Sequence, residues 1–523
     1  MHRVVTAAAG AADAIRAADT FPRLIRAAAA LYGEEQAVIL SGEAIETESL
    51  SFTGLERASA ELARGLLAYG AGKGTRIGII AGNGPFFATA FAAIARMGGI
   101  AIPISTTIRA NELVRVLRQS DVAGLIVQRT FLATDYAQRL NDALPELGTH
   151  ADPGLRIAAV PYLRWIASTG AGLKPAVLDL SALIAGANSV EESLLIAVEA
   201  EVSAADQMVE IYTSGSMALP KGVKHNHGPI LFRTHYLRDK LGPQRGQKLP
   251  AALPMFWVGG LMMALLPNLA AGATTMCTEK TLRNSRMAFG SVLADEDLQA
   301  MAGARVIWGL GMTETLGPYS YGDELRAPGY PLCAPMDHFA EGFELRVADA
   351  HDNPVTEGQI GEIQIRGYAV TPGLHKIPRD RCFTRDGFCR TGDMGLFKGR
   401  RLLFTGRSGD MIKTAGSNVS PAEVELEMQQ LDGVQSAYVV GLPDGERGQI
   451  VVAAVVAGDQ AIDFGDVEAK LRQRLSSYKV PRAFVAIRRE EVPLLPSNKV
   501  ARREIATMLE ERLGRTGVSP VKR

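Results

Sequence analysis

The sequence predicts an α/β protein whose parallel sheets are covered by helices, and one pattern that occurs three times supports this fold class. In each occurrence, a stretch with helical spacing of apolar residues precedes a short apolar run. The three pairs are 51–70 with 75–82, 86–99 with 100–105, and 112–120 with 122–128. Because strands that alternate with helices join through helical crossovers, we expect mainly parallel sheets with helices on their faces.

The second half of the chain predicts two smaller units. Short β-rich segments at 343–349 and 361–367 predict a small β subdomain at about 340–408. Farther along, a helix at 420–431 with a capping pattern at its start opens an α+β domain. The other elements expected there are strands at 435–442, 450–456 and 483–488 and a helix at 466–475.

A chain of 523 residues is too long for one ordinary core, so more than one domain is expected. The change of pattern places the large N-terminal domain, which includes the β subdomain, at residues 1–408. The small C-terminal domain is expected at residues 409–523.

The composition excludes several classes of partner. The chain has 56 Lys and Arg and 56 Asp and Glu, so no excess of positive charge points to nucleic acid. Its four cysteines lack the paired spacing of zinc sites or disulfide frameworks and predict reduced thiols in the cytoplasm. His225 and His227 form an H-x-H pair with no further ligand nearby, so we expect a structural role for both. Small molecules are the expected partners.

No stable membrane insertion is expected. The most apolar stretch, 258–277, is long enough to span a bilayer. However, the glycine pair 259–260 and Pro267 favour a buried helix, a turn and a strand. Asp13 argues against a transit peptide in the Ala-rich first fifteen residues, which are expected to be a loose start.

The sharpest local signal is the segment 212-YTSGSMALPKGV-223. It contains Thr213, Ser214, Gly215 and Ser216, and Lys221 closes it. Loops of this composition offer backbone N–H groups and hydroxyls to phosphate oxygens, and a lysine adds positive charge. The Walker spacing is absent. Taken alone, an ordinary polar surface turn is an equally good interpretation.

Four further segments follow in order: 309-GLGMTET-315, 390-RTGDMG-395, 406-GRSGDMIKTAGSNVSPAEVE-425 and 496-PSNKVARRE-504. With these companions the chain resembles the adenylate-forming superfamily of acyl- and aryl-CoA synthetases, luciferases and nonribosomal-peptide adenylation domains. It is most similar to a stand-alone fatty or alicyclic acid–CoA ligase. The resemblance runs from about residue 20 to about residue 508.

The resemblance implies a two-step reaction with ATP, Mg²⁺ and CoA as cofactors. A carboxylic acid and ATP give an acyl-adenylate and pyrophosphate, and CoA then takes the acyl group and releases AMP. In this family the C-terminal domain is a mobile lid on the AMP-binding domain.

The resemblance also implies catalytic roles for three residues. Lys499 bridges the substrate carboxylate and the phosphate, Thr313 hydrogen-bonds the α-phosphate, and Glu314 holds Mg²⁺. Two unit charges about 4 Å apart cost about 4 kcal/mol at an effective dielectric of about 20, so positive charge there speeds the attack. The ordinary alternatives are a solvated lysine and a surface or helix-capping carboxylate.

Asp393 and Arg407 are the implied contacts to the ribose, because a carboxylate accepts hydrogen bonds from two hydroxyls. Alternatively, Asp393 is a surface carboxylate, and Arg407 pairs with Asp410 or Glu423. The other implied nucleotide-binding residues are Thr213, Ser214, Gly215, Ser216 and Lys221 at the phosphates, and Gly290, Ser291, Leu310, Gly311 and Met312 near the base.

The segment 254-PMFWVGGLMMAL-265 lines the acyl channel by the same resemblance. Phe256 and Trp257 are expected to form a bulky apolar wall, and Gly259 and Gly260 to leave room beside it. Charged residues are absent from this segment, which favours a fatty, alicyclic or otherwise bulky apolar acid over an amino acid. An ordinary core position is an equal alternative for Phe256.

The resemblance places a hinge at Gly409, about which the C-terminal domain turns between the two steps. Glycine accepts dihedral angles that other residues avoid. Lys413 and Gly416 are expected on the face that serves thioester formation. A simple Ser-Gly-Asp turn is the alternative.

Three departures from the family pattern leave other functions open. Met217-Ala218 replaces a Thr-Gly pair, Leu310 replaces the aromatic residue that stacks on adenine, and the chain passes from Cys277 to Arg283 without several family elements. Two further possibilities stay undecided: a partner subunit closes the pocket, or the protein is a homodimer. No carrier-protein domain is seen in the sequence, so the alternatives are a stand-alone loader of a separate carrier protein and a degenerate nucleotide-binding subunit.

Overall fold

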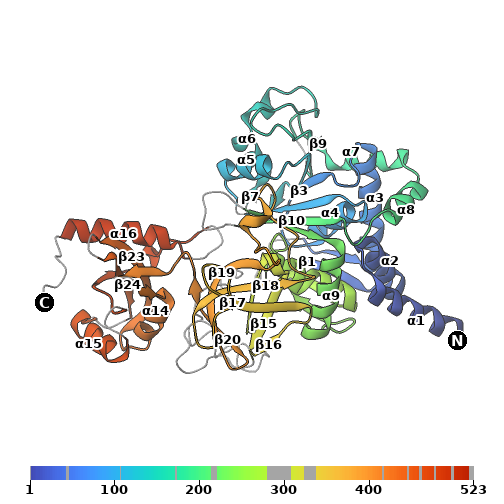
Figure 1. The fold of residues 1–523 in the computed structure, drawn as a ribbon. Helices are drawn as coiled ribbons and strands as arrows, with labels where there is room; N and C mark the ends of the chain where they lie inside the picture. The colour runs from blue at the N-terminus through green and yellow to red at the C-terminus, as the bar shows by residue number, and fades with distance from the viewer. Residues whose placement is uncertain are drawn as a thin grey trace. The chain divides into compact units, whose positions relative to one another are not determined.

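The computed structural model describes residues 2–42, 46–106, 108–132, 134–170, 173–213, 221–251, 253–278, 308–322, 337–414, 417–444, 447–458, 462–475, 479–495 and 500–516 (Figure 1). The chain divides into two compact units. The first comprises residues 1–286, 312–317 and 368–381, and the second comprises residues 287–311, 318–367 and 382–523. The division expected between residues 408 and 409 stays a prediction.

The first unit is built on a seven-stranded sheet in the order β11-β10-β4-β3-β5-β8-β9. All neighbouring strands are parallel except β10 and β11, which form an antiparallel hairpin. The predicted parallel sheet is therefore confirmed. The strands are β3 (Arg76–Ile80), β4 (Ile100–Ile104), β5 (Gly124–Val127), β8 (Trp165–Ser168), β9 (Leu178–Asp179), β10 (Gln207–Thr213) and β11 (Lys221–Asn226).

The three predicted helices of this unit are confirmed as α3 (Phe52–Ala68), α4 (Pro85–Arg96) and α5 (Ala110–Gln119). The Ser51 side chain caps α3 by accepting a hydrogen bond from Gly54 N. The expected loose start is instead helix α1 (His2–Ala17). The remaining helices are α2 (Phe21–Tyr32), α6 (Tyr136–Ala143), α7 (Leu180–Ala185), α8 (Glu192–Ala200) and α9 (His227–Leu241).

The apolar stretch 258–277 forms the predicted buried helix, turn and strand. It contains α10 (Val258–Gly260), a π-helical turn (Leu261–Leu265) and α11 (Leu266–Ala271), and it ends in β13 (Thr274–Thr278). Strand β13 lies in a four-stranded sheet in the order β12-β13-β1-β2. The other strands of that sheet are β12 (Lys248–Pro250), β1 (Gln36–Ser41) and β2 (Glu48–Ser51), and β6 (Thr130–Phe131) pairs with β7 (Thr134–Asp135) elsewhere.

Within the described residues, no individual helix combines the length and apolarity that crossing a bilayer requires. One bent pair of helical segments, Leu180–Ser189 with Glu192–Ala200, satisfies both criteria by length and composition alone.

The second unit contains the predicted β-rich segments. An antiparallel sheet comprises β17 (Phe343–Ala348), β18 (Gly361–Gly367), β19 (Cys389–Lys398) and β20 (Arg401–Arg407). A three-stranded sheet comprises β14 (Trp308–Met312), β15 (Gly317–Gly322) and β16 (His338–Phe339).

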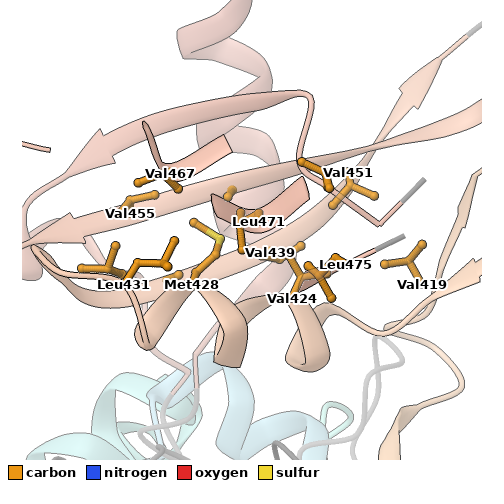
Figure 2. Packing of buried hydrophobic residues seen from close by; sticks show 14 of the residues in the cluster. Val419, Val424, Met428, Leu431, Val439, Val451, Val455, Val467, Leu471 and Leu475 are labelled. Carbon is orange, nitrogen blue, oxygen red and sulfur yellow. The ribbon is translucent and has the colours of Figure 1, made fainter. Parts of the chain in front are cut away.

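The C-terminal part of the second unit is a sheet with helices on both faces. Alternate residues of β23 face opposite sides, so Val439 packs with Val424 of α14 and Leu471 of α15, as Figure 2 shows. On the other face, Val440 packs with Ile505 of α16. The elements are β21 (Ile412–Thr414), β22 (Ser417–Val419), β23 (Val434–Asp444), β24 (Gly448–Ala457), β25 (Ala483–Ile487), α14 (Pro421–Gln429), α15 (Phe464–Arg474) and α16 (Arg502–Thr516).

Candidate functional site

The hairpin of β10 and β11 holds both ends of the predicted phosphate loop. Thr213 at the end of β10 is paired with Lys221 at the start of β11, and Tyr212 is paired with Gly222. Residues 214–220, which include Ser214, Gly215 and Ser216, lie outside the described part of the chain. The two described members of the predicted set, Thr213 and Lys221, therefore face each other across the neck of the loop.

The buried carboxylate of Glu210 lies next to this neck of the hairpin. Glu210 on β10 is fully buried, accepts a hydrogen bond of 2.8 Å from the Tyr212 hydroxyl, and lies 2.6 Å from the Arg76 guanidinium. Burial and the Glu210 charge raise the pKa of Tyr212, so the phenol stays protonated and donates. A Cβ on Gly222 would lie 2.5 Å from the Glu210 carboxylate and 2.8 Å from the Tyr212 hydroxyl, so a larger residue there would displace this hydrogen-bonded pair.

The sequence analysis missed Glu210. Its signal is an acidic residue at a buried position of the otherwise largely apolar run 207-QMVEIYT-213.

Thr313 and Glu314 lie together in a short turn after β14. Both are half-buried, and they form a 3₁₀ turn with Thr315. The Thr315 hydroxyl donates to Gly317 O at 2.7 Å and accepts from Met312 N at 3.2 Å, which closes the turn. The structure therefore places the predicted pair on a backbone that is tied at both ends.

The predicted acyl-wall residues are adjacent and in ring contact. Phe256 is buried and Trp257 is half-buried, and their ring centroids are 5.3 Å apart in an edge-to-face arrangement. The expectation that Gly259 and Gly260 leave room here is wrong. A Cβ on Gly260 would lie 2.2 Å from Pro254 O, and one on Gly259 would lie 2.6 Å from a Leu253 methyl group. The glycines permit close backbone packing.

Asn83, which the sequence analysis did not identify, anchors the segment before this wall. It is 3% exposed, accepts a hydrogen bond of 2.7 Å from Met255 N, and donates one of 2.8 Å to Leu253 O. Its signal is an amide residue shortly after the buried strand β3, where a side chain can bind neighbouring backbone.

In the second unit, Asp393 and Arg407 are neighbours. They are opposite each other in the register of β19 and β20, and Arg407 Nε donates to Asp393 Oδ1 at 3.0 Å. Asp393 is 2% exposed, whereas the Arg407 side chain is 56% exposed. The surface alternative for Asp393 is therefore wrong, because Asp393 is buried, and the partner of Arg407 is Asp393 rather than Asp410 or Glu423.

Other predicted residues are distributed as follows. Leu310 is buried in β14, next to Gly311. Gly409 lies in the turn after β20, and Lys413 lies in β21, opposite Asn418 of β22. Gly290, Ser291, Gly416 and Lys499 lie outside the described residues.

Glu314, the residue expected to hold magnesium, is a half-buried carboxylate in the 3₁₀ turn. The described residues contain no group of three or more His, Cys, Asp or Glu side chains that could hold a metal ion. Mg²⁺ usually keeps several waters and is bound by one or two carboxylates together with phosphates. A single carboxylate such as Glu314 is compatible with that kind of site, and its role stays a prediction.

Comparisons with known proteins identify both parts of the chain. The family model for AMP-binding enzymes matches residues 25–308, and the model for the AMP-binding enzyme C-terminal domain matches residues 423–499. Sulfoacetate–CoA ligase from Cupriavidus necator is 27% identical, over 92% of this chain and 97% of that protein. Mitochondrial medium-chain acyl-CoA ligase ACSF2 from Pongo abelii is 25% identical, over 92% of this chain and 86% of that protein. Feruloyl-CoA synthase from an Amycolatopsis species is 26% identical, over 87% of this chain and 93% of that protein.

Solved structures share the fold. The anthranilate–CoA ligase AuaEII, in complex with anthranoyl-AMP, matches 94% of this chain and 98% of that chain, with a TM-score of 0.75 and 19% identity. ATP-bound MatB from Rhodopseudomonas palustris matches 92% of this chain and 96% of that chain, with a TM-score of 0.71 and 21% identity.

Proposed function

The chain belongs to the family of AMP-binding enzymes and is an AMP-forming acid–thiol ligase, and on that premise we propose that it joins an apolar carboxylic acid to CoA. The proposed acid is fatty, alicyclic or otherwise bulky. The relatives' names include a sulfonated, a medium-chain and an aromatic acid, so the substrate class rests on this chain's own residues.

The observation that carries the substrate class is the apolar character of the segment around the Phe256–Trp257 pair. No charged residue occurs between Lys248 and Glu279. The edge-to-face ring pair lies within this run, and the Asn83 side chain fixes the backbone before it. Burying an alkyl or ring substituent of the acid against such an apolar segment stabilises the bound state by about 25 cal/mol per Å² of buried apolar surface. The segment offers no partner for a second charge on the acid.

In the adenylation step, we assign the triphosphate to the loop that starts at Thr213 and ends at Lys221. Thr313 would donate its hydroxyl to the α-phosphate, and Lys499 would reduce the repulsion between the acid's carboxylate and that phosphate. Glu314 would hold a magnesium ion, which would neutralise further charge on the phosphates. The carboxylate oxygen attacks phosphorus, the bond to the leaving pyrophosphate breaks, and an acyl-adenylate remains.

We assign the ribose hydroxyls to Asp393, with Arg407 beside it. Arg407 donates to Oδ1 of this carboxylate, which keeps the guanidinium next to the group that we assign to the ribose. In the second step the CoA thiol attacks the acyl carbonyl and AMP leaves. Gly409, Lys413 and Gly416 are proposed to act at this stage.

Acid-dependent exchange of labelled pyrophosphate into ATP, measured over a panel of carboxylic acids, tests the proposal. We expect medium-chain, alicyclic and bulky apolar acids to support the fastest exchange. Preference for dicarboxylic, sulfonated or amino acids would refute the substrate class. Thioester formation with CoA and with carrier proteins then identifies the acceptor, for which we expect CoA.

The variant Trp257→Gly examines the wall directly. Removing an indole should move the preference towards longer or bulkier acids, with the ratio of kcat/KM values changing by about tenfold to a hundredfold. The matched control is Trp165→Phe. Trp165 is a buried residue of β8 in the seven-stranded sheet, so this change should leave the preference among acids unchanged. An acid profile of Trp257→Gly identical to that of the unaltered enzyme would place this indole outside the channel.

A further inference from the structure

The turn that carries Thr313 and Glu314 is held by the side chain of His225 and by the backbone N–H of Thr371, and neither residue has been given a catalytic or binding role. We propose that His225 and Thr371 are positioning residues that fix this turn against β11, the strand that leaves the phosphate loop. The inference rests on the proposed roles of Thr313 and Glu314 in handling magnesium and the α-phosphate.

His225 holds the first of the two residues. Its Nε2 lies 2.8 Å from the carbonyl oxygen of Thr313, and because a carbonyl oxygen only accepts, Nε2 must carry the hydrogen. The imidazole is fully buried, and its Nδ1 meets no hydrogen-bond partner among the described residues. Burial lowers the pKa of His225 to about 4, so the ring is neutral near pH 7 and has one N–H to give.

Thr371 holds the second residue. Its backbone N–H donates to the carbonyl oxygen of Glu314 at 2.7 Å. Its hydroxyl donates to Lys224 O on β11 at 2.7 Å and accepts from Gly373 N at 3.2 Å. Thr371 is 2% exposed, and the bonds of its hydroxyl to Lys224 O and to the backbone of Gly373 fix where its backbone N–H points.

The segment that contains Thr371 runs beside β11 and is bonded to it repeatedly. Gly373 O accepts from Lys224 N at 3.3 Å, and Gly222 O accepts from His375 N at 2.8 Å. Leu374 forms an antiparallel bridge with Val223. Thus β11 reaches the consecutive carbonyl groups of Thr313 and Glu314 by two separate routes, one through His225 and one through Thr371.

The consequence is a fixed relation between the turn and Lys221. Strand β11 begins at Lys221, so the two routes tie the turn to the strand that carries this lysine. A catalytic group that shifts by about 1 Å loses rate on the order of a hundredfold. His225 and Thr371 contact only the backbone of the turn, so they are positioning residues and not catalytic residues.

The test compares His225→Phe with a matched control, His227→Phe. His227 is the other member of the H-x-H pair and is equally buried, but its Nδ1 accepts from Phe21 N at 3.2 Å, away from the turn. Calorimetric titration of ATP, with and without Mg²⁺, measures how much the ion strengthens ATP binding. Pyrophosphate exchange and thioester formation from supplied acyl-adenylate measure the two half-reactions.

In His225→Phe we expect the gain in ATP affinity from Mg²⁺ to fall by about threefold or more and exchange to slow by about tenfold to a hundredfold. Thioester formation should slow much less than exchange, since magnesium and pyrophosphate take no part in that step. His227→Phe should keep the full effect of Mg²⁺. His225→Gln, which retains an N–H donor, should recover most of the loss.

Two variants keep the proposal falsifiable if His225→Phe does not fold. Thr371→Val removes only the hydroxyl, and a melting curve reports whether Thr371→Val and His225→Gln are folded. An unchanged effect of Mg²⁺ on ATP binding in Thr371→Val would overturn the proposal, as would equal effects in His225→Phe and His227→Phe. Absence of exchange in the unaltered enzyme would instead refute the proposed function, because the binding measurement does not depend on turnover.

Discussion

At the scale of single residues, charge is the quantity that the proposed reaction must manage. The attacking carboxylate and the α-phosphate are both negative, and Lys499 is the residue assigned to offset their repulsion. In Lys499→Ala we expect acyl-adenylate formation to fall on the order of a thousandfold, with ATP binding nearly unchanged. Thioester formation from supplied acyl-adenylate should persist. Rapid-quench measurement of each half-reaction checks this, and Arg503→Ala, an exposed basic residue on α16, is the control.

Burial of His227 predicts a pH dependence of stability. Burial is the main cause that lowers the pKa of His227 from 6.5 to about 4, although the Asp206 charge opposes it. The unfolded chain therefore binds a proton between pH 6.5 and about 4 that the folded chain does not, so stability is lost as the pH falls through that range. Protonation would also place a hydrogen on Nδ1, where Phe21 N now donates.

The Tm of the unaltered enzyme should consequently be lower at pH 5 than at pH 7. In His227→Gln, whose side chain does not titrate, the difference between the two pH values should be smaller. Calorimetric melts of both proteins at the two pH values decide this. Equal differences in the two proteins would show that His227 does not contribute.

At the scale of elements, the sequence predicted what local spacing controls and missed what distant pairing controls. The helix α3 and the strand β3 were found because apolar spacing and buried runs are properties of neighbouring residues. The pairing of Val38 in β1 with Thr275 in β13 joins distant segments, so no local pattern could indicate it.

The same difference between local pattern and distant pairing explains which predictions about the site were wrong or incomplete. The sequence indicated that Gly259 and Gly260 lack side chains, but only the fold shows that Leu253 and Pro254 fill the space. The contact of Asp393 with Arg407 follows from the register of two strands, which their separate sequences leave undetermined.

Asn83 gives a prediction at this scale, because it holds an element rather than a substrate. Asn83→Ala leaves Met255 N–H and Leu253 C=O without their buried partner, which costs about 1–3 kcal/mol for each unsatisfied group. We expect a lower Tm together with an altered preference among carboxylic acids. Asn268→Ala is the matched control, since Asn268 is also buried but donates to Thr275 Oγ1 at 3.1 Å. It should lower Tm without changing the preference, and an unchanged preference in Asn83→Ala would contradict the prediction.

At the scale of the whole molecule, the proposed reaction comprises two half-reactions on one acyl group. Two half-reactions with different nucleophiles demand different surroundings for the same acyl group, since a carboxylate attacks in one and a thiol in the other. A change of conformation between the steps meets that demand, and Gly409 is the position where the sequence predicts it.

The turn at Gly409 makes the hinge testable with a matched pair of substitutions. Asp410 N and Met411 N both donate to Arg407 O, at 3.0 and 3.2 Å. Among the described residues, apart from Gly409 and its two chain neighbours, no heavy atom lies within 4 Å of a Cβ built on Gly409. Gly409→Ala should therefore fold and remain able to rotate. Gly409→Pro holds φ near about −65°, so it should favour one conformation and slow one half-reaction by about tenfold or more while sparing the other. Separate rates of adenylation and thioester formation, with melting curves to verify folding, provide the measurement. If Gly409→Pro slowed both steps equally, or matched Gly409→Ala in both, the molecule would not use this residue to pass from the first reaction to the second.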